Sequence, residues 1–138
     1  MIYTCRKMSL PSEVQSIREV DKFVEELCGE FNVPDSKCGE IRVAVKEATT
    51  NAVYHGYTIG RARLFFVEFE FAEDSILKFV ITDTGKGFDH ENIPDPSDSS
   101  NLKKDTGRGV FLMKKLADRC TFNKGGSEVV LEFELGGS

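Results

Sequence analysis

Hydrophobic and polar residues alternate along several segments of the chain, which is the pattern of half-buried strands. The clearest alternation runs over residues 65–71 and 77–82, and a turn over 72–75 makes these two segments an antiparallel pair. A first strand is predicted over residues 2–10 and a last one over 129–135. Each strand has one apolar and one mixed face, which is typical of a sheet covered by helices on one side.

Apolar residues at spacings of three and four predict two long helices in the first half of the chain. The first has Ser12 as its N-cap, with Gln15 completing a capping box. The second starts at Pro34-Asp35 and ends near His55, where Gly56 is a natural stop. The two apolar stripes are Val14, Ile17, Val20, Phe23, Val24, Leu27 and Phe31 in the first helix, and Ile41, Ala44, Val45, Ala48 and Ala52 in the second.

Residues 84–108 follow neither period, and structureless stretches of this length are usually functional or disordered. A third helix is predicted from about Gly109 to Ala117. The order of elements is then strand, helix, helix, strand, strand, loop, helix, strand, strand. We expect a single α+β domain over residues 1–138, a two-layer sandwich with helices on one face of a mixed, mostly antiparallel sheet.

Composition excludes several classes of protein. The 138 residues are 40% hydrophobic, with eleven Phe and no Trp, as in an ordinary folded domain. No apolar run approaches the roughly 20 residues of a membrane span, and the N-terminal residues lack the apolar core of a secretory signal. The net charge is −5 and no basic block exceeds a pair. We therefore expect neither a membrane nor a direct nucleic-acid partner.

The four cysteines, Cys5, Cys28, Cys38 and Cys120, are scattered along the chain and form no C-x-x-C motif. With only two histidines besides, a structural zinc site is not expected. Scattered cysteines without an export signal are typical of reduced thiols in a cytoplasmic protein.

Three polar side chains stand where apolar ones are expected. Glu47 and Asn51 are four residues apart and border the apolar stripe of the second helix, which indicates either a pocket edge or a solvated helix face. Asp83 continues the inward phase of the strand before it, where an unpaired carboxylate costs several kcal/mol. It binds a ligand there or closes the strand as a cap.

Two glycine-rich segments accompany these side chains. Residues 83–87 read Asp-Thr-Gly-Lys-Gly, and Gly107-Arg108-Gly109 is predicted to open the third helix. Free N–H groups and the positive dipole end at a helix N-terminus bind phosphate. Neither a P-loop nor a G-x-G-x-x-G motif occurs, so those two kinds of nucleotide site are unsupported.

Together, the segments 47–57, 83–87 and 107–113 resemble the N, G1 and G2 boxes of the GHKL ATPase superfamily. Within it the chain is most similar to the small bacterial anti-sigma factor serine/threonine-protein kinases. The resemblance covers about residues 5–135 and implies the GHKL ATP-binding fold.

The resemblance implies that Asn51 coordinates Mg²⁺ on the ATP phosphates, that Glu47 is the general base and that Asp83 binds the adenine amino group. It implies an ATP lid over residues 90–106, in which Lys103 and Lys104 reach the γ-phosphate or a partner unless they are a solvated pair. It also implies nucleotide contacts from Gly85, Gly87, Thr106, Gly107, Arg108, Gly109, Val110 and Ser127.

One position departs from the family pattern, and another, His55, has two possible roles. Ser127 follows Gly126 where the family often has a threonine near adenine. His55 contacts phosphate or a partner protein, or it complements the C-terminal end of its helix, and the second role is slightly favoured.

The function implied is an ATP-dependent kinase, with ATP/ADP and Mg²⁺ as cofactors. It would phosphorylate a serine or threonine of a small anti-anti-sigma antagonist, sequester a sigma factor and form a homodimer. One alternative is a non-catalytic module of the same fold that binds nucleotide or a partner. Another is a detached histidine-kinase catalytic domain, which needs a histidine-bearing helix pair that the residues ahead of the motifs do not provide.

Overall fold

The computed structural model of the chain describes the backbone of residues 2–57, 63–72, 75–83 and 101–135, and the side chains of residues 4–54, 63–72, 75–83 and 107–135. Its elements are β1 (Ile2–Pro11), α1 (Val14–Glu30), α2 (Asp35–Tyr57), β2 (Leu64–Ala72), β3 (Ile76–Asp83), α3 (Asn101–Leu116), β4 (Arg119–Asn123), the short 3-10 helix η1 (Lys124–Gly126) and β5 (Glu128–Glu134). This is the predicted order of helices and strands.

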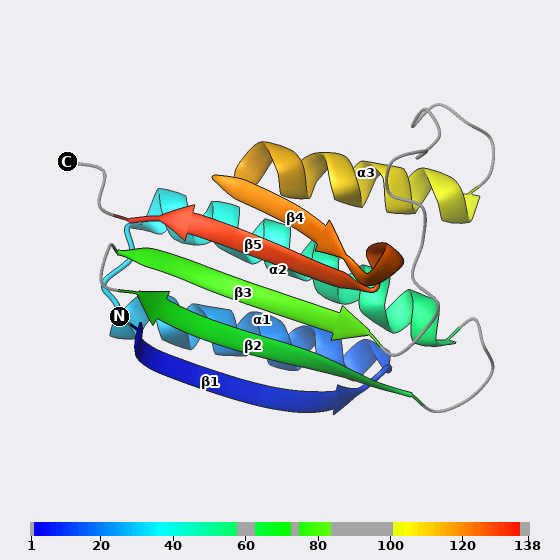
Figure 1. Cartoon of the computed structure of the whole chain (residues 1–138), viewed down its shortest axis with the longest axis horizontal. Coiled ribbons are helices and arrows are strands. Elements are labelled where there is room, and N and C mark those ends of the chain that lie inside the picture. Colours follow the sequence, from blue (N-terminus) through cyan, green and yellow to red (C-terminus); the bar gives the residue numbers. More distant parts are fainter. Residues whose placement is uncertain (1, 58–62, 73–74, 84–100, 136–138) are drawn as a thin grey trace.

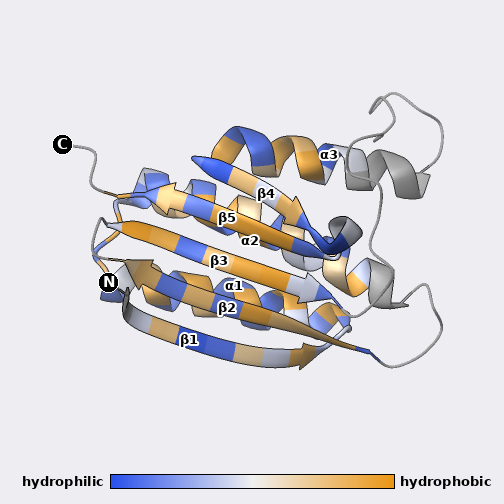
Figure 2. Cartoon of the chain, in the orientation of Figure 1, coloured by the Kyte–Doolittle hydropathy of each residue, from blue (hydrophilic) through white to orange (hydrophobic). Residues whose placement is uncertain are grey.

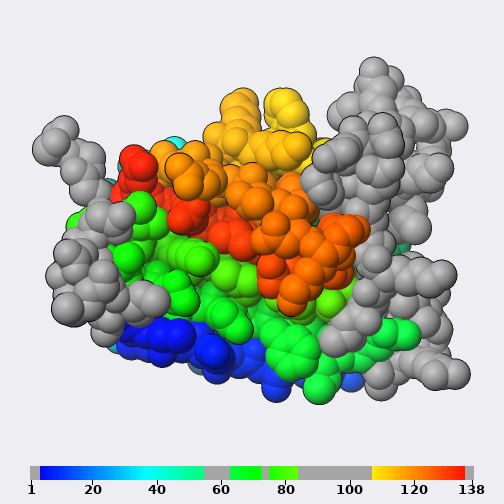
Figure 3. Space-filling model, in the orientation of Figure 1, coloured from blue at the N-terminus to red at the C-terminus, as the bar shows by residue number. Residues whose placement is uncertain are grey.

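The five strands form one open sheet in the order β1-β2-β3-β5-β4. Every neighbouring pair of described strands is antiparallel, so the sheet contains none of the parallel pairing that a mixed sheet would have. The helices lie on one face of the sheet (Figure 1), and the strands remain at the surface on the opposite face (Figure 3). The predicted α+β two-layer architecture is confirmed.

The core lies between the sheet and the helices. Along β2, β3 and β5, hydrophobic residues alternate with hydrophilic ones (Figure 2), and the inward positions are buried. At its centre the fully buried ring of Phe69 contacts Phe23, Phe31 and Phe79 at centroid distances of 6.3, 5.6 and 5.2 Å. Burying one such side chain contributes about 1.5–3 kcal/mol, so this cluster fixes how the helices sit on the sheet.

The predicted stripe of α2 is buried at all five of its positions, and the helix runs through Gly56 to Tyr57. Helix α1 ends in a Schellman motif. Asn32 adopts a left-handed φ of 54°, the N–H of Val33 donates to the Cys28 carbonyl at 2.9 Å, and the N–H of Asn32 donates to the Gly29 carbonyl at 3.3 Å. The connection to α2 is therefore tight.

The start of α1 differs from the prediction. Its N-cap is Glu13 without a side-chain hydrogen bond, so Ser12 and Gln15 form no capping box. The N–H of Ser12 donates instead to the Arg63 carbonyl at 2.7 Å, because β1 runs on beside the residues that lead into β2. Val14, the first residue of the predicted stripe, is 70% exposed.

The third helix begins at Asn101, eight residues before the predicted start at Gly109. Leu102, Lys103 and Lys104 are good helix formers, which favours an earlier start. Gly107 and Gly109 therefore lie inside α3. No helix within the described ranges is long and apolar enough to span a membrane.

Candidate functional site

The contact between α2 and α3 brings Glu47 and Asn51 together with Gly109. A Cβ built on Gly109 would lie 3.0 Å from Glu47 Oε2 and 3.5 Å from Asn51 Nδ2. Glu47 is half-buried and Asn51 is only 8% exposed, so they border the core as the sequence indicates. The absence of a side chain at Gly109 is what lets α3 approach these two polar groups closely.

Asn51 carries an unsatisfied group. Its Nδ2 atom is buried and has no hydrogen-bond partner among the described residues. Leaving a buried donor unpaired costs about 1–3 kcal/mol, and such groups often mark a site for water, an ion or a ligand.

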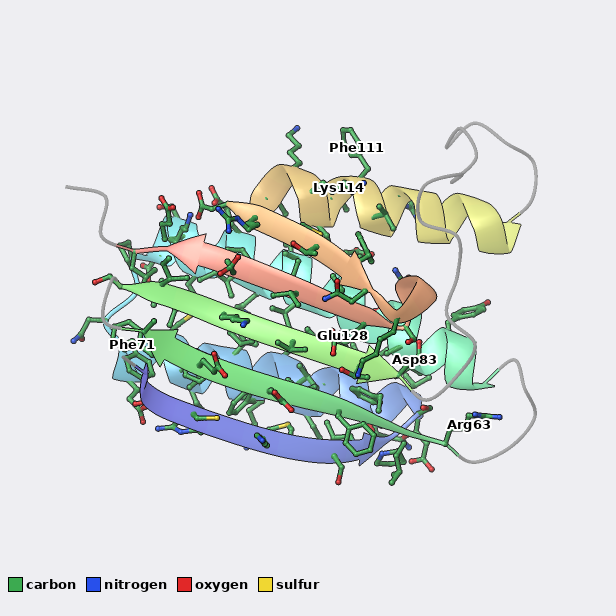
Figure 4. The ribbon with its side chains drawn as sticks, in the orientation of Figure 1. Arg63, Phe71, Asp83, Phe111, Lys114 and Glu128 are labelled. Carbon is green, nitrogen blue, oxygen red and sulfur yellow. The ribbon has the colours of Figure 1, made fainter. Side chains whose placement is uncertain are left out.

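Asp83 reaches the same region from the end of β3. It is 6% exposed, and its backbone N–H donates to the Ser127 carbonyl at 2.8 Å. The inward direction predicted for this side chain is therefore observed. Figure 4 shows Asp83 at the end of the sheet where β3 approaches η1 and the start of β5.

A small cavity joins Asn51 and Asp83. Its volume is about 10 Å³, which is room for roughly one water molecule. Its walls come from α2, β3, α3, β4 and the η1–β5 segment: Ala48, Asn51, Ala52, Ile81, Asp83, Met113, Phe122, Gly126, Ser127 and Val129. In this conformation the cavity is too small for a nucleotide base.

The connection between β4 and β5 shapes one wall of that cavity. Lys124, Gly125 and Gly126 have positive φ values of 53°, 66° and 97°. The Ser127 hydroxyl donates to the Lys124 carbonyl at 3.0 Å. Glu128, labelled beside Asp83 in Figure 4, accepts a hydrogen bond from Asn123 Nδ2 at 3.0 Å, which ties the two ends of the turn together.

The glycine-rich segment of α3 does not form a helix N-terminus here. Gly107 and Gly109 are buried inside α3, where a backbone N–H normally donates to the carbonyl four residues earlier. The prediction of free N–H groups at this point is therefore wrong for this conformation. Arg108 is exposed and Val110 is buried.

Several predicted residues lie outside the described part of the chain. Gly85, Gly87 and most of the predicted lid fall in residues 84–100. The side chains of His55, Lys103, Lys104 and Thr106 are likewise not described.

Met113 and Phe122 are cavity residues that the sequence analysis did not single out. Met113 lies one helical turn beyond Gly109, and Phe122 follows Cys120 at a strand spacing. Both spacings can be read from the sequence, but each is weak evidence for a cavity residue because the segments are short.

The site provides oxygen atoms suited to Mg²⁺, which prefers hard oxygen ligands and usually takes several from waters and substrate phosphates. The described residues contain no group of three His, Cys, Asp or Glu side chains that could hold a metal alone. The side-chain oxygen of Asn51, on the same face of α2 as Glu47, would be one such ligand.

Comparison with known families places most of the chain in one group. Residues 10–133 match the family described as histidine kinase-like ATPase domain. The proteins named serine-protein kinase RsbW from Staphylococcus aureus strains MSSA476 and Newman are 35% identical to the chain over 95 residues. That match covers 62% of this chain and 57% of each relative, so the chain spans little more than half of their length.

A solved structure has the same fold. It is the crystal structure of the RsbU and RsbW domains of Rv1364c from Mycobacterium tuberculosis, with a TM-score of 0.62 and 18% sequence identity. The match covers 96% of this chain and 32% of that one.

Proposed function

The chain belongs to the histidine kinase-like ATPase domain family, and on that premise we propose that it is an ATP-dependent protein serine/threonine kinase with anti-sigma activity. Its relatives named serine-protein kinase support the reaction class. The proposal treats residues 1–138 as one catalytic domain that binds ATP or ADP with Mg²⁺.

The observation that carries the proposal is the meeting of Asn51 and Asp83 at one cavity. They come from different elements, are buried, and present an amide and a carboxylate to the same cavity. Asp83 would accept a hydrogen bond from the adenine amino group. Asn51 would face the phosphates and their Mg²⁺.

Glu47 is placed one helical turn from Asn51 and would take the proton from the attacking hydroxyl. Phosphoryl transfer depends mainly on positioning and on neutralising charge. A bound Mg²⁺ would supply most of that neutralisation, with Arg108 as an available cation. Backbone contacts would come from Gly85 and Gly87, and further contacts from Thr106, Val110 and Ser127.

The cavity lined by the described residues has room for about one water, and Gly109 lies close to Glu47 and Asn51. The same observation favours the alternative function, a non-catalytic module that regulates by binding a partner while the site stays closed.

The acceptor would be a serine or threonine on a small anti-anti-sigma protein. Phosphorylation adds about −1.5 to −2 charge to that surface, which disfavours its docking on a kinase of net charge −5. The released kinase, as a homodimer, would then sequester a sigma factor.

The test separates binding from transfer. Mg-ATP affinity is measured by calorimetry, and proteins captured from the native cell are labelled with radioactive γ-phosphate by the wild type and by Glu47→Gln. We expect both proteins to bind Mg-ATP and only the wild type to label a serine or threonine. Binding without labelling by either protein supports the non-catalytic alternative, and absence of binding refutes the proposal.

A further inference from the structure

One acidic side chain outside the cavity connects three strands at the end of the sheet where Asp83 lies. Glu128 opens β5, which runs between β3 and β4. In the strand register it is opposite Thr82 on one side and Asn123 on the other. Because the next residue, Val129, is buried in the core, the Glu128 side chain lies on the face of the sheet away from the helices. Only 18% of that side chain is exposed.

The Glu128 carboxylate contacts both neighbouring strands and the turn between β4 and β5. Its Oε2 atom accepts a hydrogen bond from Asn123 Nδ2 at 3.0 Å, at the end of β4. Its Oε1 atom lies 3.5 Å from Lys124 Nζ and accepts a longer hydrogen bond of 3.4 Å from the Thr82 hydroxyl, near the end of β3. One side chain thus holds the ends of β3 and β4 and the start of η1 against the start of β5.

The turn that Glu128 contacts (residues 124–127) has an unusual backbone. Lys124, Gly125 and Gly126 all have positive φ values, which a residue with a Cβ, such as lysine, rarely adopts. Such a conformation persists only where the contacts around it hold it in place. These contacts are the ion pair between Lys124 and Glu128 and two hydrogen bonds to the Lys124 carbonyl, from the Ser127 N–H at 3.3 Å and its hydroxyl at 3.0 Å.

The braced segments carry one wall of the cavity on their inner side. Asp83 directly follows Thr82, and both Asp83 and Ser127 line the cavity. The Asp83 N–H donates to the carbonyl of Ser127, the residue before Glu128, at 2.8 Å. Figure 4 labels Asp83 and Glu128 at the same end of the sheet. Since consecutive strand residues point to opposite faces, Glu128 acts on the outer face of the strands that place the Asp83 carboxylate on the inner one.

We propose that Glu128 is a positioning residue for recognition of the nucleotide base. It keeps the end of β3 and the turn at one fixed spacing, and it thereby directs the Asp83 carboxylate to the adenine amino group. A ligand gains full affinity from a hydrogen bond only when the acceptor is already held in place before binding. This inference rests on the proposed function, in which Asp83 accepts that hydrogen bond.

The experiment measures Mg-ATP affinity by calorimetry in wild type and variants. We expect Glu128→Ala to bind about fivefold more weakly, which is part of the loss expected when a hydrogen bond to a charged acceptor is removed. Glu128→Gln keeps an oxygen acceptor for Asn123 and is expected to keep wild-type affinity. Asn123→Ala removes the shorter hydrogen bond, leaves Glu128 in place and is expected to weaken binding by about threefold.

The matched control is Glu132→Ala. Glu132 lies four residues further along β5 on the same face of the sheet, and its carboxylate pairs with Arg119 Nε at 3.7 Å. We expect unchanged Mg-ATP affinity in this variant. The melting temperature is expected to fall by about 4 °C at most in both Glu132→Ala and Glu128→Ala, because such ion pairs contribute little to stability. A difference in binding between the two variants is then not a difference in folding.

A double-mutant cycle tests whether Glu128 acts through Asp83. In an Asp83→Asn background, Glu128→Ala is expected to leave Mg-ATP affinity unchanged, because the acceptor that Glu128 positions is already lost. Wild-type affinity in Glu128→Ala, an equal loss in Glu132→Ala, or losses that add in the cycle would each overturn the inference while the proposed function stands. Absence of Mg-ATP binding by the wild type refutes the proposed function and the inference with it.

Discussion

The close contact at Gly109 predicts that a methyl group added there slows phosphoryl transfer and brings none of the stabilisation that alanine usually gives a helix. In Gly109→Ala the new Cβ lies 3.0 Å from Glu47 Oε2 and 3.5 Å from Asn51 Nδ2, so either the carboxylate or α3 must move. Gly39 offers a matched control because it is also inside a helix, α2, and a Cβ there meets nothing within 4 Å.

The two substitutions share one energetic term and differ in another. Alanine in place of glycine inside a helix stabilises by about 0.5–1 kcal/mol. For a domain of this size that raises the melting temperature by about 2–4 °C, and Gly39→Ala is expected to show the whole gain. In Gly109→Ala the close contact cancels it, because a shift of α3 also loosens Val110 and Met113, which are 4% and 1% exposed.

The assay is thermal unfolding followed by the initial rate of phosphoryl transfer to the captured substrate. A misplaced catalytic group costs rate steeply, by about a hundredfold for a displacement of 1 Å. Because Glu47 needs to move by only part of that distance, we expect about a tenfold slower transfer in Gly109→Ala and an unchanged rate in Gly39→Ala. Equal stabilisation of both variants, with wild-type transfer in Gly109→Ala, would refute the reasoning.

The same structure supports three further predictions. Asp83→Asn weakens Mg-ATP binding by about tenfold in calorimetry, since a hydrogen bond to a charged acceptor loses about 1.4 kcal/mol; equal affinity would overturn the role of Asp83 at adenine. Asp118→Ala lowers stability at pH 7 by about 1 kcal/mol, because Asp118 accepts hydrogen bonds from the Glu134 N–H and Lys37. The hydrogen bond from the Glu134 N–H, followed by that from Lys37, holds the Asp118 pKa below its usual 3.8. In thermal melts at decreasing pH, the stabilisation from Asp118 is therefore complete above pH 3.8 and is lost as the pH falls through the lowered pKa. A stability difference between wild type and variant that does not change with pH contradicts this. Phe69→Ala destabilises by about 3–5 kcal/mol in urea titration, whereas a loss below about 1 kcal/mol would show that this ring is not central to the core.

The sheet and the first two helices were predictable because burial imposes a period on the sequence. A strand with one covered face must alternate, so Phe65, Phe69 and Phe79 point inward in the structure as in the pattern. The failure of the capping box to form was not predictable from the sequence, because the hydrogen bond from the Ser12 N–H to the Arg63 carbonyl is tertiary. A local motif cannot register a competing partner fifty residues away.

The predicted start of α3 was wrong for a related reason. Glycines 107 and 109 suggest a helix end when only local propensity is considered. In the structure they are buried in α3, and Gly109 permits the close approach to Glu47. The same residue type serves both purposes, and its spacing in the sequence does not tell them apart.

The periodicity of the sequence predicted where each candidate site residue lies relative to the core, but not which of these residues meet. The helical phase of Glu47 and Asn51 and the strand phase of Asp83 placed these side chains at the border of the core, as the structure shows. That Asn51 and Asp83 share a cavity could not follow from phase alone, since phase carries no information on which elements meet. It was implied by the resemblance to the ATPase family, whose membership is confirmed by the match over residues 10–133.

The hairpin of α1 and α2 shows how a short connection supplies long-range information. Two antiparallel helices joined by a short connection bring together residues that are equally far from the turn. Asp21 and Arg42, which hydrogen-bond at 2.8 Å, are centred between Phe31 and Asn32. Their contact therefore follows from the connection that the Schellman motif closes. Inserting two residues after Asn32 is thus expected to break the ion pair between Asp21 and Arg42.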